Sequence, residues 1–423
     1  MSKRIYRVVS VNEVSVESLG QELGRGEKVV VAVDVAKFDN KAAVIQGDKV
    51  LRTIGWKAPA QSKQFVDLVS DIMRVAPVEL VLESTGTYGD PLRAQMAELD
   101  VPVFRVSTKQ AHDAAEVFDG VPSMHDAKAC QLLGWLHANG RSQRWTVRSD
   151  GERDLVAAAE TYELHNAHLM ACLSRIEAKL ARHFPELATI VDLDNASTLA
   201  MLEQFGSPAR IGREKAAVEK LLREVGGTFL DAEKPERVVD AARNTLGMRM
   251  TAGECQTLAQ LAREAIRQRQ LKAAAKKELE GYAAKDAAMS RAAAVIGVAT
   301  AAIITAHAGS AQNFASSAAY VKALGLNLKE KSSGEHKGQL KITKRGPALA
   351  RRYLYLAVLR LLQREPHFKA WYLRKVDREG GKRKQKAVVA LMRKLASALW
   401  HVARGQEFDP TKLFDVQRLG IAT

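Results

Sequence analysis

Cysteine is scarce in this sequence, which has only Cys130, Cys172 and Cys255 in 423 residues. Their number is odd and they lie far apart, so they form neither a disulfide framework nor the paired spacing of a zinc site. The first residues contain no apolar segment or cleavage site typical of a secretion signal. We therefore expect a protein of the reducing cytoplasm.

Long hydrophobic runs are also missing. No stretch of about 18 apolar residues occurs, so no membrane-spanning helix is predicted. Aromatic residues make up only 6% of the chain, while Ala, Leu, Arg and Glu are abundant. This composition indicates a protein with much α-helix.

Acidic residues are few in the C-terminal third. Between Lys337 and Arg404 there are 19 lysines and arginines but only three acids, and this imbalance equals the net charge of the whole chain, +16. Such a segment predicts a polyanionic partner. Nucleic acid is the first interpretation, and an anionic membrane surface is the alternative.

The order of the expected elements divides the chain into four parts. Residues 1–27 read as a loosely structured lead-in. Residues 28–148 predict an α/β domain with a mixed sheet, in which an antiparallel meander of three strands precedes alternating helices and strands. The expected strands are Lys28–Val35, Asn40–Gln46, Lys49–Trp56, Val78–Ser84 and Val101–Val106.

Residues 149–286 lack strand patterns. Leu155, Tyr162, Leu169 and Ile176 recur every seven residues, which fits either a coiled-coil-like helix or an amphipathic helix in a bundle. Residues 287–423 predict a mainly helical domain, with basic helices at Pro347–Gln363 and Lys386–Arg404 joined by a link.

Three acids are candidates for chemistry. Asp34 ends an apolar, β-branched run, Glu83 ends a second strand that looks buried, Glu79–Glu83, and Asp126 opens a helix. Carboxylates at the ends of neighbouring strands converge at one edge of a sheet, where they can hold hard cations such as Mg²⁺. Two such ions can position a phosphodiester for cleavage. A surface aspartate at a strand exit is the alternative interpretation for each of these acids alone.

A polar, basic segment with several glycines, residues 325–346, forms an unusually long expected loop, and such loops usually serve function. It contains Ser332, Ser333 and Gly334 among lysines. A serine in this setting could attack a phosphate, with cations stabilising the developing charge. A flexible loop that only contacts phosphates is the alternative. Further along, Trp371 and Tyr372 could stack on bases or pack in the core.

These motifs together resemble the insertion-sequence transposases of the IS110 type, which are related to the Piv DNA invertases and are described as bridge-RNA-guided recombinases. The resemblance spans nearly the whole chain. It rests on VAVDVAK around Asp34, ESTGTYGDPL around Glu83, DGVPSMHDAKAC around Asp126, and SSGEHKGQLKITKRG around Ser333. It implies a RuvC-like, ribonuclease-H-fold N-terminal domain with four acids and a C-terminal transposase domain with a serine.

The sequence departs from this family at one position. The fourth acid of the family falls on Ala129. Either this chain lacks that acid, or another acid such as Asp119 replaces it, or the sequence carries an Asp-to-Ala substitution that blocks cleavage. A shifted register with Asp126 as the last acid fits the surrounding motif less well.

The resemblance implies a DNA transposase or recombinase that cuts and rejoins DNA. Ser333 would be the nucleophile, with Ser332 in reserve, and Asp34, Glu83 and Asp126 would hold Mg²⁺. A structured non-coding RNA would guide the protein, which would act as a dimer or tetramer on element ends and target DNA in a prokaryotic nucleoid. The expected nucleic-acid contacts are Lys337, Lys341, Lys344, Arg345, Arg351 and Arg352. A metal-dependent nuclease that uses water and an inactive RNA- and DNA-binding scaffold are the alternatives.

Overall fold

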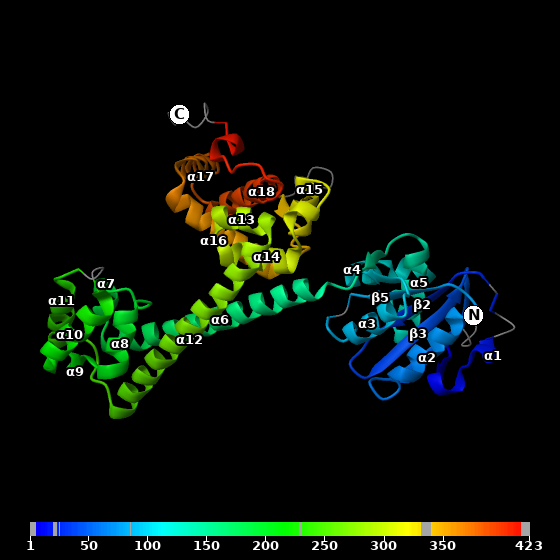
Figure 1. Cartoon of the computed structure of the whole chain (residues 1–423), viewed down its shortest axis with the longest axis horizontal. Helices are drawn as coiled ribbons and strands as arrows, with labels where there is room; N and C mark the ends of the chain where they lie inside the picture. The colour runs from blue at the N-terminus through cyan, green and yellow to red at the C-terminus, as the bar shows by residue number, and fades with distance from the viewer. Residues whose placement is uncertain are drawn as a thin grey trace. The chain divides into compact units, whose positions relative to one another are not determined.

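The computed structural model of the chain describes residues 6–19, 23–24, 26–84, 86–227, 231–330 and 340–415. It divides into two compact units, Met1–Ser149 and Asp150–Thr423 (Figure 1). The first unit is built on a sheet and the second is mainly helical. Within the described ranges, no helix has the length and apolarity that a membrane span requires.

A mixed sheet forms the centre of the first unit. Among the residues described there, its strands lie in the order β1, β4, β3, β2, β5, β6, β7. Neighbours β2, β3 and β4 form the predicted antiparallel meander, and β2, β5 and β6 run parallel. The strands are β1 (Val8–Ser10), β2 (Val29–Asp34), β3 (Asp39–Gln46), β4 (Lys49–Lys57), β5 (Val78–Glu83), β6 (Val103–Val106) and β7 (Gln143–Trp145).

Helices cover both faces of this sheet, which is why β2 reads as a nearly continuous apolar run. Val31 and Val33 of β2 face a core that includes α2 and α3, where Phe65 stacks on Trp56 with ring centroids 3.9 Å apart. Ala32 faces a second core that includes α4 and α5. The helices are α1 (Val16–Leu19), α2 (Ser62–Met73), α3 (Asp90–Glu98), α4 (Thr108–Asp119) and α5 (Asp126–Ala138), with a 3₁₀ turn at Val11–Glu13.

The described part of the lead-in is more ordered than the sequence predicts. Strand β1 pairs in parallel with β4, with Val8 opposite Thr53, and Val11 and Leu19 are buried in the core beneath α2. Three strand residues carry too little periodicity to be recognised in a sequence. Their strand conformation comes from pairing with a strand more than 40 residues away.

Two long helices form the frame of the second unit. Helices α6 (Asp150–His183) and α12 (Ala252–Lys285) pack side by side in opposite directions, so the start of one lies beside the end of the other (Figure 1). The heptad residues of α6 are buried in this packing: Leu155 shares a core with Leu279, and Ile176 shares one with Leu258. The heptad pattern is therefore explained within one chain and gives no evidence of an oligomer.

Small helices complete a core at each end of this pair. Near the end of α6 lie α7 (Leu187–Ile190), α8 (Ala196–Phe205), α9 (Pro208–Arg213), α10 (Lys215–Gly226) and α11 (Lys234–Arg243). After α12 come α13 (Ala287–Ile296), α14 (Val298–Ala308), α15 (Ser317–Ala323), α16 (Ala348–Arg364), α17 (Pro366–Arg378) and α18 (Lys384–Ala403), with 3₁₀ turns at Ala311–Asn313 and Pro410–Leu413.

Helix α17 corrects the prediction of a link between the two basic helices. Pro366 occupies its first turn, where a proline needs no backbone donor, and Phe368 is fully buried. Only residues 379–383 remain as a connection, with left-handed Gly380 and Gly381 forming the turn. The basic segment is thus mostly folded into helices.

Candidate active site

Two of the predicted acids lie side by side at one edge of the sheet. Asp34 is the last residue of β2 and Glu83 the last of β5, and the two strands are parallel neighbours with Val33 opposite Leu82. Asp126 is the first residue of α5, which packs against β2 and β3. The fold therefore brings residues from three separate sequence segments to the carboxyl end of the central strands.

The electrostatics of Asp34 show how close these acids are. Burial raises the pKa of Asp34 to about 6, and the negative charges of Asp126 and Glu83 contribute to the rise, while Lys41 opposes it. A half-buried carboxylate with two acidic neighbours has excess negative charge around it. Such a group gains from a bound cation or a proton.

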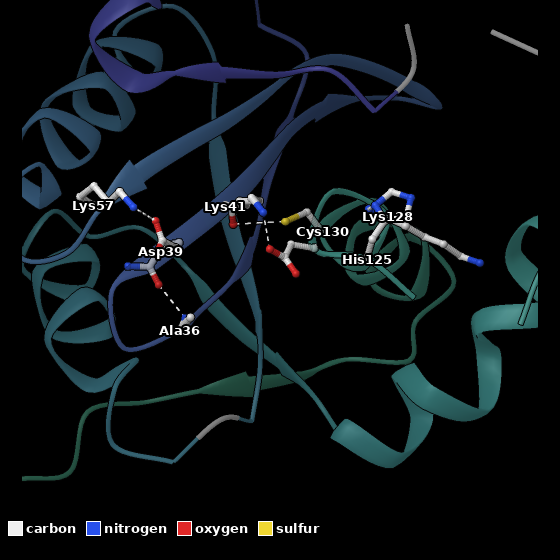
Figure 2. A network of polar contacts seen from close by, with 9 residues as sticks. Ala36, Asp39, Lys41, Lys57, His125, Lys128 and Cys130 are labelled. Carbon is white, nitrogen blue, oxygen red and sulfur yellow. Dashed lines mark hydrogen bonds and ion pairs between the residues drawn. The ribbon is translucent and has the colours of Figure 1, made fainter. Parts of the chain in front are cut away.

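Lys41 supplies a cation that the sequence analysis did not identify. It lies opposite Asp34 in the β2–β3 ladder, and its ammonium donates a hydrogen bond to Asp126 Oδ2 (Figure 2). This hydrogen bond is the main reason why the pKa of Asp126 lies below its ordinary value. Lys41 thus neutralises one of the three acids.

A buried lysine fixes the segment before α5. Lys128 is 1% exposed, and its ammonium donates to Asp119 Oδ1 at 2.6 Å, Val121 O at 2.6 Å and Ser123 O at 3.0 Å. A buried ammonium needs this full set of acceptors. The contacts close the segment 119–123 onto the helix and set the position of Asp126.

Asp119 serves as a hydrogen-bond acceptor that holds Lys128 in place. Besides Lys128, it accepts a hydrogen bond from the Tyr6 hydroxyl at 3.2 Å, and the Lys128 contact lowers its pKa. These contacts give no support to Asp119 as a replacement for the missing fourth acid. His125 caps the helix, its Nδ1 accepting from Lys128 N at 3.3 Å.

Ala129 lies in the first turn of α5, one turn after Asp126. Its backbone N donates to His125 O at 2.9 Å, and the residue is partly exposed. Positions three apart share a face of a helix, so Ala129 lies on the side from which Asp126 reaches Lys41. The next residue, Cys130, is buried and its thiol donates to Lys41 O at 3.2 Å.

The carboxylates have the ligand chemistry that Mg²⁺ prefers, but they are not arranged around a single ion. Carboxylate oxygens at a strand edge are the ligands that this cation prefers. Within the described ranges, however, no group of three or more His, Cys, Asp or Glu side chains is placed to hold a metal ion. Asp126 accepts a hydrogen bond from Lys41, so its carboxylate could hold a cation only after releasing that lysine.

The predicted nucleophile falls outside the described residues, as do Ser332 and Lys337. The segments that flank this loop are described. Strands β8 (Leu328–Lys329) and β9 (Lys341–Ile342) form an antiparallel pair, and Lys344 N donates to Gly325 O at 2.9 Å. The two ends of the loop are therefore joined and anchored between α15 and α16.

The five described residues predicted to contact nucleic acid differ in their surroundings. Lys341, Lys344 and Arg345 are exposed. Arg351 donates to Leu324 O at 3.3 Å and Gly346 O at 2.6 Å, and Arg352 forms an ion pair with Glu163 of α6. The first three are available to a phosphate, while the two arginines already have contacts within the protein.

The raised pKa of Asp34 predicts how the stability of the folded protein changes with pH. Because its folded-state pKa is raised, the folded protein holds this proton more tightly than the unfolded chain does, so stability falls as the pH rises through about 6. Asp34→Asn is expected to increase the melting temperature at pH 7 and to flatten its decline between about pH 4 and 6. Differential scanning calorimetry in EDTA measures both effects.

The matched control for this experiment is Asp39→Asn, because Asp39 is exposed and paired with Lys57 at the other end of the β2–β3 connection (Figure 2). This variant should keep the original dependence on pH. If the melting temperatures of Asp34→Asn and Asp39→Asn depend on pH in the same way, the claim that burial and neighbouring acids raise the pKa of Asp34 is wrong.

Comparison with known proteins identifies a family of transposases in the C-terminal part of the chain. No curated protein sequence matches this chain significantly. Residues 292–373 match the family model described as Transposase IS116/IS110/IS902 family. The matched region runs from α13 into α17 and includes the whole serine-containing loop. This match supports the interpretation of the chain as an IS110-type DNA transposase.

Proposed function

We propose that this protein cuts and rejoins DNA through a covalent bond to Ser333, assisted by the acidic residues of the first unit and guided by a structured RNA. The observation that carries the proposal is the family match, because it covers the loop in which Ser333 lies. The acids Asp34, Glu83 and Asp126, brought to one edge of the mixed sheet, provide the second support.

The reaction needs two phosphoryl transfers. In the first, the Ser333 hydroxyl oxygen bonds to a DNA phosphorus while the bond from that phosphorus to one deoxyribose oxygen breaks. The serine proton passes to a base, and the released deoxyribose oxygen takes up a proton. In the second, the oxygen of a DNA hydroxyl bonds to the phosphorus of the phosphoserine and gives up its proton to a base, while the bond from phosphorus to the serine oxygen breaks. The serine oxygen takes up a proton, and a DNA phosphodiester is restored.

The acids contribute negative charge. Burial and the charges of Asp126 and Glu83 raise the pKa of Asp34 to about 6, so a bound cation would stabilise its ionised form. Asp34 and Glu83, later with Asp126, would hold Mg²⁺, and the ion would stabilise charge on the phosphate oxygens. The exposed Lys341, Lys344 and Arg345 would contact the DNA or RNA backbone beside the loop, which gives salt-dependent affinity.

A denaturing gel tests the proposal. The protein is used as its Ala129→Asp version, with DNA of the element end, the adjacent RNA and Mg²⁺, and compared with the same version carrying Ser333→Ala or Ser332→Ala. We expect a protein–DNA adduct that survives denaturation, is lost with Ser333→Ala and is kept with Ser332→Ala.

The other outcomes identify the alternatives. Cleaved DNA without an adduct in every variant would contradict the serine mechanism and favour a nuclease that uses water. Tight binding with neither cleavage nor adduct would contradict catalysis altogether and favour a binding scaffold.

A further inference from the structure

Helices α16, α17 and α18 line an open cavity of about 440 Å³. The three helices lie together in the C-terminal part of the chain (Figure 1). Its size falls in the range of small-molecule sites, which is about 300–1,000 Å³. Leu359 and Leu362 of α16 and Val388 of α18 form an apolar lining. The cavity is open to solvent, so an apolar group can enter it.

Two tyrosines give the cavity aromatic walls. Tyr355 of α16 and Tyr372 of α17 both line it and are only partly buried. The neighbouring Trp371 instead lies against Phe414, with ring centroids 5.9 Å apart, and beneath Lys394. The structure thus separates the two aromatic residues of α17: Trp371 packs in the core and Tyr372 faces the cavity.

Two lysines complete the cavity lining. Lys369 of α17 and Lys384 of α18 line the cavity and are exposed. Neither forms an ion pair with a described acid. Glu379 already accepts hydrogen bonds from two other lysines, Lys375 and Lys386, each at 2.9 Å. The hydrogen bond from Lys375 contributes most to lowering the pKa of Glu379 to about 2. The lysines of the cavity therefore keep uncompensated positive charge.

We propose that this cavity binds one unstacked nucleobase of a single-stranded nucleic acid, with the base against Tyr372 and the flanking phosphates on Lys369 and Lys384. An apolar, aromatic site edged by cations matches a base between two phosphates. A duplex keeps its bases stacked on each other, so only a single strand can present one. The inference rests on the proposed function, since it assigns a contact to the nucleic acid that a transposase handles.

The full chain is tested with fluorescein-labelled 12-residue strands of oligo-dT and oligo-rU and with a DNA duplex of equal length. Tyr372→Ala is expected to weaken single-strand binding by roughly 10-fold, the usual scale for one stacked base, and to leave duplex binding unchanged. Tyr372→Phe, which keeps the ring, should bind like the original. Lys369→Ala should also weaken single-strand binding, and Lys277→Ala, which removes an exposed lysine of α12, is its matched control for the loss of one positive charge.

Photocrosslinking with 5-iodouracil in the same strands locates the base, and the expected crosslink maps to Tyr372 or Tyr355. The inference would be overturned if Tyr372→Ala bound single strands as tightly as the original protein, or if crosslinks formed only outside the cavity. Either result would favour a protein segment as the ligand of the cavity. Equal losses on single strand and duplex would also overturn it. An adduct at Ser333 without any Tyr372 effect would refute this inference alone, whereas a Tyr372 crosslink without an adduct would refute only the serine mechanism.

Discussion

The Ala129→Asp version of this chain is expected to form on the order of 100-fold more covalent adduct than the sequence with alanine, the scale typical of one group that stabilises transition-state charge. Position 129 lies one helical turn after Asp126, so an aspartate there adds a carboxylate on the face that reaches Lys41. The added acid would compete for Lys41 and free Asp126 for a cation. Adduct is quantified on a denaturing gel over a Mg²⁺ titration.

The control for this gain is Ala129→Asn, which has nearly the same size but no charge. It should remain as inactive as the alanine form. Equal adduct from the alanine, asparagine and aspartate forms would mean that the acidic edge of the sheet needs no fourth carboxylate, and the role assigned to position 129 would be wrong.

Gly346→Ala is expected to destabilise the second unit by about 3 kcal/mol or more. This is the upper end of the cost measured when an extra carbon is inserted into a well-packed region. A Cβ at Gly346 would lie 2.2 Å from Ala323 O and 2.8 Å from Gly325 N. Both contacts are backbone atoms at the base of the serine loop, so neither can rotate away. Urea unfolding followed by circular dichroism measures the change.

Gly281→Ala is the matched control, because Gly281 lies in α12 and a Cβ there meets no atom within 4 Å. It should be neutral or stabilising, since alanine favours a helix by up to about 1 kcal/mol over glycine. A Gly346→Ala protein as stable as the Gly281→Ala protein would contradict the close backbone packing beneath the loop.

The strands of the central sheet could be predicted because burial on both faces leaves a strong signal. Val29–Asp34 is a continuous apolar run that ends in an acid, and Val78–Glu83 is mostly apolar and also ends in an acid. Both segments form strands within one residue of the expected bounds. The meander and the mixed sheet were likewise confirmed. Strand β1 and helix α17 were missed, the first because its pairing is long-range and the second because Pro366 reads equally well as a helix start or a break.

The site could be predicted only in part. The acids stand at strand ends, a position that a sequence reveals, but their partners depend on register and burial. Lys41 could have been found only from its place opposite Asp34 in the β2–β3 ladder. Lys128 looks like a surface residue, and only the folded segment 119–123 supplies the three oxygen acceptors that allow its burial.

The central claim is that a serine of the basic loop becomes covalently linked to DNA, and peptide mapping of the adduct tests it most directly. The adduct of the Ala129→Asp protein is digested with nuclease and protease, and the peptide that retains a nucleotide is sequenced by mass spectrometry. The proposal predicts a phosphate-linked nucleotide on Ser333. A nucleotide on any other residue, or no modified peptide from protein that has cut its DNA, would contradict it.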